Sequence, residues 1–309
     1  MENLRASGLM VLSMALFALE DMFVKLLSGA MPVGQIVMIL GGLGGAVFWA
    51  LLALRGKRLL TRDLLRPAVL TRNAGEVIGT LGFVSALALT ELSSASAILQ
   101  TLPLAIVLGA AVFLREPVGW RRWTAILTGF AGVLLIVQPW GAGFSALSLL
   151  AVVGVIGLAL RDLTTRGIPA SVPSNQLSAS AFLALVPAGA VLMAVTGDAP
   201  VPVGAGDALR FVACMVFGVL GYATLVMATR VGEASVIAPF RYSRLVFALI
   251  VAVVVFGERP DLQTLIGSAV IVGSGSYAMW REALRRRRAA RAAALAAGSA
   301  HAASLSRPG

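Results

Sequence analysis

The stretch Ala18-Leu-Glu-Asp-Met-Phe-Val-Lys25 recurs in altered form as Ala159-Leu-Arg-Asp-Leu-Thr-Thr-Arg166, 141 residues later in the chain. The two copies share the pattern A-L-x-D-x-x-x-(K/R), and after six intervening residues each continues with P-x-x-Q. With one residue of slip, later acidic positions also correspond, Glu91 with Glu233 and Glu116 with Glu258. The order and near-constant offset of these matches indicate an internal duplication.

The composition places both copies in a membrane. Of the 309 residues, 59% are hydrophobic and only 13% are charged, whereas a soluble domain has about 25% charged residues. The apolar residues form runs close to the ~20 helical residues that cross a bilayer. We therefore predict an all-α polytopic membrane protein. Ten spans are expected, at about 6–28, 33–54, 68–89, 93–114, 120–138, 146–166, 175–196, 207–229, 234–256 and 262–281.

Ten spans in two copies give five spans in each half. We expect a first repeat at 1–140, a second at 141–282 and a disordered basic tail at 283–309. Because five is an odd number, the second repeat must be inverted relative to the first. Lys and Arg gather in the loops on one side, while Arg210 and Arg259 alone face the other, which predicts that both termini are cytoplasmic.

Inverted repeats are typical of secondary transporters, which bind substrate near the midplane and alternate its access to the two sides. The only histidine, His301, lies in the tail, and Cys214 is the only cysteine. We therefore expect no enzyme activity, no metal site and no cofactor. A non-transporting membrane scaffold stays open as an alternative.

The formal charge of +11 does not predict nucleic-acid binding, because much of it lies in short loops and in the run 285–288. That run is expected to touch anionic lipid. Small residues such as those of Gly41-x-x-x-Gly45 suit close helix packing, and we expect a monomer or a weak homodimer.

Two short motifs carry a resemblance to a known family. An acidic turn follows the fourth span of each half, Leu114-Arg-Glu-Pro117 and Phe256-Gly-Glu-Arg-Pro260, and small or Ser-rich stretches begin those spans at 93–97 and 233–236. With the small residues of 267–275, these motifs resemble the drug/metabolite transporter superfamily, specifically its EamA-type ten-helix exporters. The resemblance covers about residues 1–282.

The resemblance implies export of small metabolites across a bacterial inner membrane, often of amino acids and including aromatic ones. Within transporters, lipophilic cations are the alternative substrate class. The ninth span departs from the family, since it reads Ala238-Pro-Phe-Arg-Tyr-Ser-Arg244 where members often have an uncharged or Glu-Pro stretch.

Charged residues at mid-span are the leading candidates for substrate contact, because such residues normally face a cavity or a partner. Arg244 lies close to the midplane of the ninth span, Arg241 lies one turn earlier, and Glu20 lies in the first span. An amino acid needs a cation for its carboxylate and an anion for its ammonium group. These three residues can supply both, although Glu20 and an arginine could equally bond to each other.

Uncharged polar residues complete the candidate substrate site. Gln100 and Tyr242 occupy equivalent positions in the two halves, and Tyr222 could stack on an aromatic substrate. Pro103 and Pro239 are expected to kink the fourth and ninth spans and to free backbone carbonyls there.

The remaining charges are interpreted as architectural. Asp21 with Lys25, and Asp162 with Arg166, have the i, i+4 spacing that allows a pair on one helix face, as structural or gate elements. Arg72 and Glu76 have the same spacing, and Arg161 lies near a membrane interface. Glu116 and Glu258 are expected to cap the helices that follow them. Whether protons are coupled to transport, through Glu20 or Glu76, is left open.

Overall fold

The computed structural model describes residues 2–115, 119–140, 145–169, 171–231 and 234–305, without the side chains of residues 3, 122, 230, 234, 235, 238, 282 and 285–305. Every regular element in these ranges is a helix. In chain order they are α1 (Glu2–Ser28), α2 (Val33–Ala53), η1 (Arg62–Leu65), α3 (Pro67–Leu89), α4 (Leu92–Leu99), α5 (Leu102–Phe113), α6 (Trp120–Val137), η2 (Ala146–Ser148), α7 (Leu149–Thr165), α8 (Ser174–Thr196), α9 (Ala205–Val231), α10 (Ala234–Ile237), η3 (Ala238–Tyr242), α11 (Ser243–Phe256) and α12 (Leu262–Leu305).

Local residue choices set the ends of these helices. Pro67 occupies the first position of α3, where its missing N–H costs nothing. Gly197 and Gly257 follow α8 and α11 with φ angles of 73° and 65°, and this left-handed conformation commonly ends a helix at a glycine.

Two membrane-length segments are interrupted, as the sequence predicts. The fourth is divided at Gln100 and Thr101 into α4 and α5, just before Pro103, and the ninth passes through the 3-10 turn η3, which contains Pro239. Proline lacks the N–H of the helical ladder and clashes with the preceding turn. Both breaks therefore lie where backbone groups become available inside the helix bundle.

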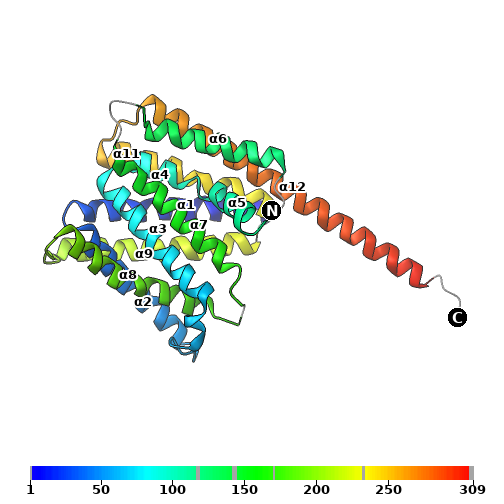
Figure 1. Ribbon diagram of the computed structural model, residues 1–309, viewed down its shortest axis with the longest axis horizontal. Coiled ribbons are helices and arrows are strands. Elements are labelled where there is room, and N and C mark those ends of the chain that lie inside the picture. The colour runs from blue at the N-terminus through cyan, green and yellow to red at the C-terminus, as the bar shows by residue number, and fades with distance from the viewer. Residues whose placement is uncertain (1, 116–118, 141–144, 170, 232–233, 306–309) are drawn as a thin grey trace.

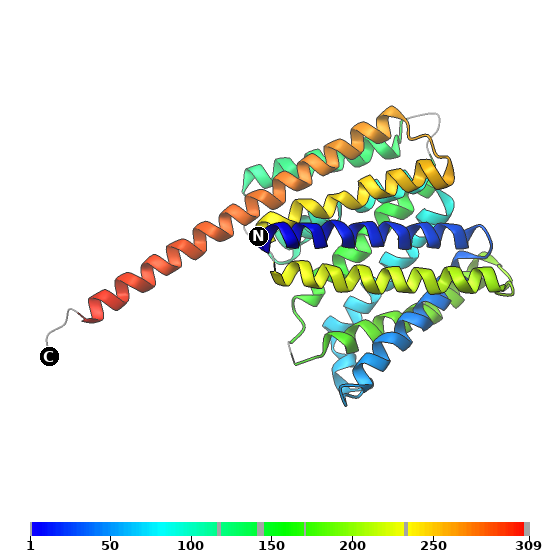
Figure 2. The same ribbon diagram turned by 180° about the vertical axis from the view of Figure 1, so that it is seen from behind.

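The helices pack in pairs that relate the beginning of the chain to its end. α1 packs on α9 and α3 packs on α7, while α2 packs on α8 and α6 on α12. Figure 2 shows α1 lying between α9 and α11, and Figure 1 shows α2 beside α8. If α1–α6 are exchanged in order for α7–α12, with α4–α5 and α10–α11 each counted as one interrupted helix, the α1–α9 contact becomes the α7–α3 contact. The α1–α11 contact then becomes the α7–α5 contact.

Glycines let the paired helices approach closely. A Cβ atom added to Gly82 of α3 would lie 2.6 Å from the backbone nitrogen of Gly154 in α7, and one added to Gly34 of α2 would lie 2.6 Å from the carbonyl oxygen of Gly189 in α8. Such small-residue contacts are a common way to pack membrane helices.

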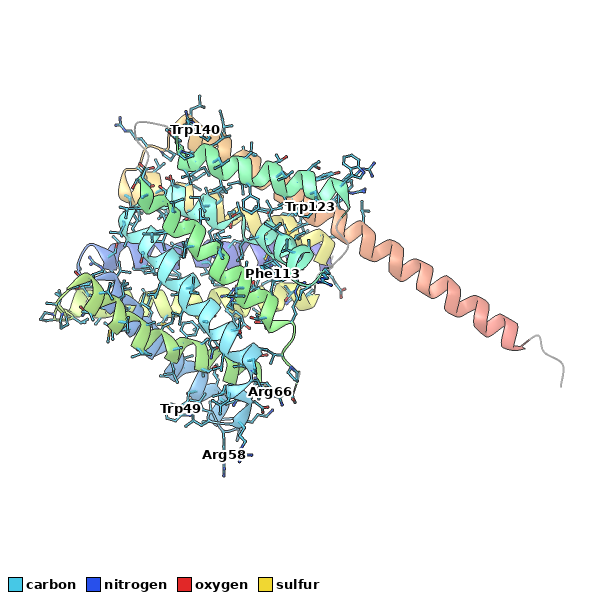
Figure 3. All side chains as sticks on the ribbon, viewed as in Figure 1. Trp49, Arg58, Arg66, Phe113, Trp123 and Trp140 are labelled. Atoms are coloured by element: carbon cyan, nitrogen blue, oxygen red, sulfur yellow. The ribbon has the colours of Figure 1, made fainter. Side chains whose placement is uncertain are left out.

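The surface exposes more apolar side chains than the surface of a water-soluble protein does. Large apolar side chains such as Val195 and Val254 are exposed on helix faces. Trp123 and Trp140 lie at opposite ends of α6, and Trp49 lies with Arg58 and Arg66 near the α2–α3 connection (Figure 3). Tryptophan is enriched at the two membrane–water interfaces.

Six segments are long and apolar enough to span a bilayer: Val33–Ala53, Leu92–Phe113, Ala146–Thr165, Ser174–Thr196, Ala205–Thr229 and Pro239–Phe256, with a shorter apolar helix at Trp123–Val137. The ends of the helices from α1 to α11 lie within a few residues of the expected bounds, while the expected number of ten membrane spans stays a prediction. The tail differs from expectation: where disorder was expected after residue 282, α12 continues as a helix to Leu305 (Figure 1). Alanine and arginine, which dominate this stretch, are both strong helix formers.

Candidate functional site

A charged cluster lies at the contact between α3 and α7, which we call the central cluster: Arg72, Glu76, Arg161 and Asp162. Glu76 accepts a hydrogen bond from Arg161 Nη1 at 3.2 Å, and its other oxygen lies 3.8 Å from Arg72 Nη2. Arg161 Nε also donates to Asp162 at 2.7 Å. Arg161 thus bridges two carboxylates from two helices.

The central cluster is also tied to α8. Arg72 donates to the carbonyl oxygen of Leu177 at 3.0 Å, and the side-chain amide of Asn73 donates to the Ser180 hydroxyl at 3.2 Å. Among the described residues, Arg72 Nε is buried with no hydrogen-bond partner. Three helices therefore converge on one polar region inside an otherwise apolar bundle.

The interrupted ninth segment brings Arg241 to this region. Arg241 lies on η3 and interacts electrostatically with Asp162 of α7. Its backbone carbonyl accepts a hydrogen bond at 3.3 Å from the side chain of Gln100, which lies at the break of the fourth segment. Tyr222 of α9 is 49% exposed and interacts electrostatically with Arg72.

A second polar group lies between α1 and α11. Arg244 donates to Asp21 through Nε at 3.1 Å and through Nη2 at 2.8 Å. The guanidinium also lies over the ring of Phe17, 5.3 Å from its centroid. The Asp21 side chain is only 5% exposed, so the pair is enclosed by protein.

A third group, which we call the end tie, closes the end of the bundle where α1 and α3 finish and α4 begins. Lys25 Nζ lies 3.4 Å from Glu258 and donates to the carbonyl of Thr90 at 2.6 Å. Glu258 accepts hydrogen bonds from the backbone N–H groups of Leu92 and Ser93 at 2.6 and 3.0 Å. The end tie therefore joins α1, α3, α4 and the α11–α12 connection.

The expected intrahelical pair of Asp21 and Lys25 is wrong. The two side chains have different partners, Arg244 and Glu258, on segments more than two hundred residues away. The reason is geometric: contacts between helices offer bidentate and capping bonds, which are stronger than an i, i+4 pair of about 0.2–0.5 kcal/mol. Asp162 bonds to its neighbour Arg161, and the expected pairing of Asp162 with Arg166 stays a prediction.

The expected capping role of Glu258 is right in kind but was assigned to the wrong helix. Glu258 caps the N-terminus of α4, whereas Asp261 caps α12 by accepting from the Thr264 N–H at 2.7 Å. Glu116, the other expected cap, lies outside the described residues.

Other candidate residues are separated by the fold. Tyr242 is buried against α12, where a Cβ on Gly275 would meet its hydroxyl, and Gln100 binds backbone. Glu20 faces Gly218 of α9, at 2.8 Å from where a Cβ would lie. Arg161, which was expected to lie at a membrane interface, instead bridges Glu76 and Asp162. The expected pairing of Arg72 with Glu76 is present but long.

The sequence does not predict that these four charged residues meet in the central cluster, although the glycine pattern of α3 indicates a close contact there. Gly75, Gly79 and Gly82 form a small-residue stripe on α3 that faces α7. Arg72 and Glu76 lie on this stripe by helical spacing, so the face that packs most closely also carries the charges. Among the described residues, no group of three His, Cys, Asp or Glu side chains is placed to hold a metal ion.

The apolar surface, the paired helices and the enclosed charges define a multi-pass helical membrane protein. The EamA-like transporter family model matches residues 4–138 and again 146–281, so the chain belongs to this family, within the drug/metabolite transporter superfamily. The family description and the names of the relatives indicate transporters. A solved structure described as "Crystal structure of protein" has a TM-score of 0.58 over 89% of this chain and 98% of the other, at 22% identity.

Curated relatives carry transporter names. The riboflavin transporter of Rhizobium johnstonii is 30% identical over 72% of both chains. The S-adenosylmethionine uptake transporter of Rickettsia bellii is 27% identical over 66% of this chain and 68% of the relative. The pseudopaline exporter CntI of Pseudomonas aeruginosa is 27% identical over 87% of this chain and 95% of the relative. The chain is thus a small-molecule transporter.

Proposed function

We propose that the protein is a secondary transporter that exports small metabolites, with amino acids, including aromatic ones, as the substrate class. It would work by alternating access between two inverted five-helix repeats, 1–140 and 141–282, with ten spans and both termini in the cytoplasm of a bacterial cell. The symmetric helix pairing supports this division. So does the emergence of α12 from the side of the bundle on which α1 begins (Figures 1 and 2).

The observation that carries the proposal is a difference in exposure between Asp162 of the central cluster and the carboxylates of the other two polar groups. The side chain of Asp21, which pairs with Arg244 between α1 and α11, is 5% exposed. The side chain of Glu258, in the end tie, is 8% exposed. Asp162, the counterpart of Asp21, is 37% exposed. A charged side chain at this depth is normally turned toward a cavity or a partner rather than toward lipid. The pattern is that of a transporter closed at one end and accessible from the other.

The charges favour a zwitterionic substrate over a lipophilic cation. The central cluster and Arg241 together hold three arginines but only two carboxylates. A bare cation would meet net repulsion there, whereas an amino acid finds both signs. The relatives named for riboflavin, S-adenosylmethionine and pseudopaline support small metabolites as a class but differ among themselves in substrate and direction.

Counterflow in proteoliposomes tests the proposal. Vesicles that contain the purified protein are preloaded with one unlabelled amino acid and diluted into the same labelled amino acid, for a panel of neutral and aromatic amino acids and two lipophilic cations. We expect accumulation of label for at least one amino acid and for neither cation. Accumulation of cations alone would favour multidrug export, and no accumulation of any compound would favour the scaffold alternative. An imposed pH gradient in the same vesicles separates proton antiport from uniport.

A further inference from the structure

We propose that the guanidinium of Arg241 binds the carboxylate of the transported substrate, while Asp162 faces the ammonium group. This inference rests on the proposed function, because it assigns the two ends of an amino acid to two side chains of the same region. It selects Arg241 from the four arginines of the central cluster and the ninth segment, Arg72, Arg161, Arg241 and Arg244.

The first argument is the state of the four guanidinium groups. Arg72 and Arg161 each lie against Glu76, and Arg244 is bidentate on Asp21. Arg241 is exposed, and within the described part of the chain its side chain has neither a hydrogen bond nor an ion pair. Leaving an arginine without a partner inside a membrane protein is costly. An anion supplied by the substrate would remove that cost, and among these four arginines Arg241 is the one whose side chain has no ion pair within the described residues.

The second argument is the backbone on which Arg241 lies. η3 is a 3-10 interruption of a membrane-length segment, and substrate sites of secondary transporters are typically built at such interruptions. The side chain of Gln100, at the equivalent break of the fourth segment, bonds to the carbonyl oxygen of Arg241. The backbone of Arg241 is thus fixed from the opposite half of the chain, while its side chain is left available.

The third argument is the acidic group across from it. Asp162 lies on another helix, α7, and acts electrostatically on Arg241, yet no hydrogen bond or ion pair joins the two side chains. Asp162 Oδ1 is held by Arg161 Nε at 2.7 Å, and Oδ2 has no partner among the described residues. An unbonded cation and a carboxylate with a free oxygen, within electrostatic range of each other, match the two charges of an amino acid.

Matched compounds test the assignment. Counterflow of labelled L-phenylalanine, L-leucine and L-tryptophan is measured with a competitor present. The competitors are the unlabelled amino acid, its amide and its decarboxylated amine. The protein variants are wild type, Arg241→Gln, Arg241→Lys and Arg210→Gln. Arg210 pairs with Asp207 near the start of α9 and is partly exposed, so its variant controls for the loss of one positive charge.

We expect only the acids to inhibit the wild-type protein and the Arg210 variant. A hydrogen bond between charged groups is worth enough that its loss should raise the apparent KM roughly 10- to 100-fold in Arg241→Gln, with partial recovery in Arg241→Lys, which keeps the charge but not the planar fork. Equal inhibition by acid and amide, or an unchanged KM in Arg241→Gln, would overturn the assignment while leaving transport itself intact. No counterflow by wild-type protein would instead contradict the proposed function.

Chemical labelling gives a second readout that does not depend on transport. Arg241→Cys is made in a Cys214→Ala background, so that position 241 carries the only thiol of the chain. The protein is then treated with a negatively charged methanethiosulfonate. We expect Arg241→Cys to be labelled, because a side chain that meets the substrate must be reached by a water-soluble anion. Absence of labelling would overturn the proposal. Arg210→Cys serves as the reference for a reactive site away from the substrate.

Discussion

Arg244 and Asp21 form a bidentate ion pair that joins α11 to α1, with Nη2 2.8 Å from Oδ1 and Nε 3.1 Å from Oδ2. One turn earlier in the same segment, Arg241 interacts electrostatically with Asp162, which is the counterpart of Asp21 in the sequence repeat. Arg244 and Arg241 of the ninth segment thus interact with the two repeated aspartates. Asp21 is buried in its pair with Arg244, whereas the side chain of Asp162 is partly exposed.

Removing Arg244 should destabilise the protein strongly. Arg244→Ala leaves the buried carboxylate of Asp21 without its cation, and breaking one side of a buried pair costs about 3–5 kcal/mol. We expect a large fall in the thermal unfolding temperature of the detergent-purified protein. Asp21→Asn with Arg244→Gln, which removes both charges, should be more stable than Arg244→Ala. If the single variant unfolded at the wild-type temperature, the pair would carry no structural load.

Weakening the end tie should expose the end of the bundle that it closes. Glu258→Ala removes the partner of Lys25 and the acceptor of two N–H groups at the start of α4; loss of a capping side chain alone costs about 0.5–2 kcal/mol. Ser96→Cys in α4, at a position that is buried in the structure, reports opening by its rate of thiol labelling. We expect faster labelling in the Glu258→Ala background than in an Asp63→Ala background, since Asp63 pairs with Arg66 on the surface. Equal rates would show that the tie does not hold this end closed.

Close packing of α3 on α7 predicts opposite effects for two glycine substitutions. A Cβ on Gly82 would lie 2.6 Å from the Gly154 nitrogen, whereas a Cβ on Gly42 would meet nothing within 4 Å. Gly82→Ala should therefore destabilise by about 1–3 kcal/mol through overpacking. Gly42→Ala should be neutral or stabilising by up to about 1 kcal/mol, because alanine is the better helix former. Thermal unfolding of the two variants side by side measures both, and a loss of stability at Gly42 but not at Gly82 would contradict the packing.

Asp261 should make the start of α12 sensitive to acid. Hydrogen bonds from Thr264 lower the pKa of Asp261 below its usual value. A lowered pKa contributes stability that is present above the ordinary value of about 3.9 and is lost as the pH falls through the lowered, folded value. Asp261→Ala should cost about 0.5–2 kcal/mol at pH 7 and less at pH 3. Unfolding temperatures of wild type and variant at the two pH values test this, and a difference that does not shrink at low pH would contradict it.

Much of the architecture is legible in the sequence, and the reasons are physical. A membrane-spanning segment must satisfy its own backbone hydrogen bonds, so apolar length, proline and glycine place the helices and their breaks to within a few residues. The repeated aspartates, Asp21 and Asp162, also prove to be members of ion pairs in the structure. Contacts between helices cannot be predicted in this way. The sequence allows Asp21 to pair either with Lys25 or with Arg244, and the structure shows the pair with Arg244. Only the packing of α1 against α11 decides between them.

The same limit applies to the central cluster. The spacing of Arg72 and Glu76 predicts their contact. The position of Arg161 near a helix end predicts a membrane interface instead, because its partner Glu76 lies on another helix. The stripe of Gly75, Gly79 and Gly82 indicates that this face of α3 packs closely on another helix, and the structure shows that helix to be α7.

The most direct test of the central claim, that the cluster between α3 and α7 shapes the substrate site, is counterflow by Glu76→Gln protein. Glu76 holds Arg161, which in turn holds Asp162, so loss of its charge should disorder the groups that meet the substrate. We expect Glu76→Gln protein to elute as a monodisperse peak but to show a roughly tenfold or greater loss of amino-acid counterflow, of the size expected for one charge-assisted bond. The surface variant Asp63→Asn should keep wild-type counterflow. Counterflow by Glu76→Gln protein at the rate of Asp63→Asn protein would contradict the account.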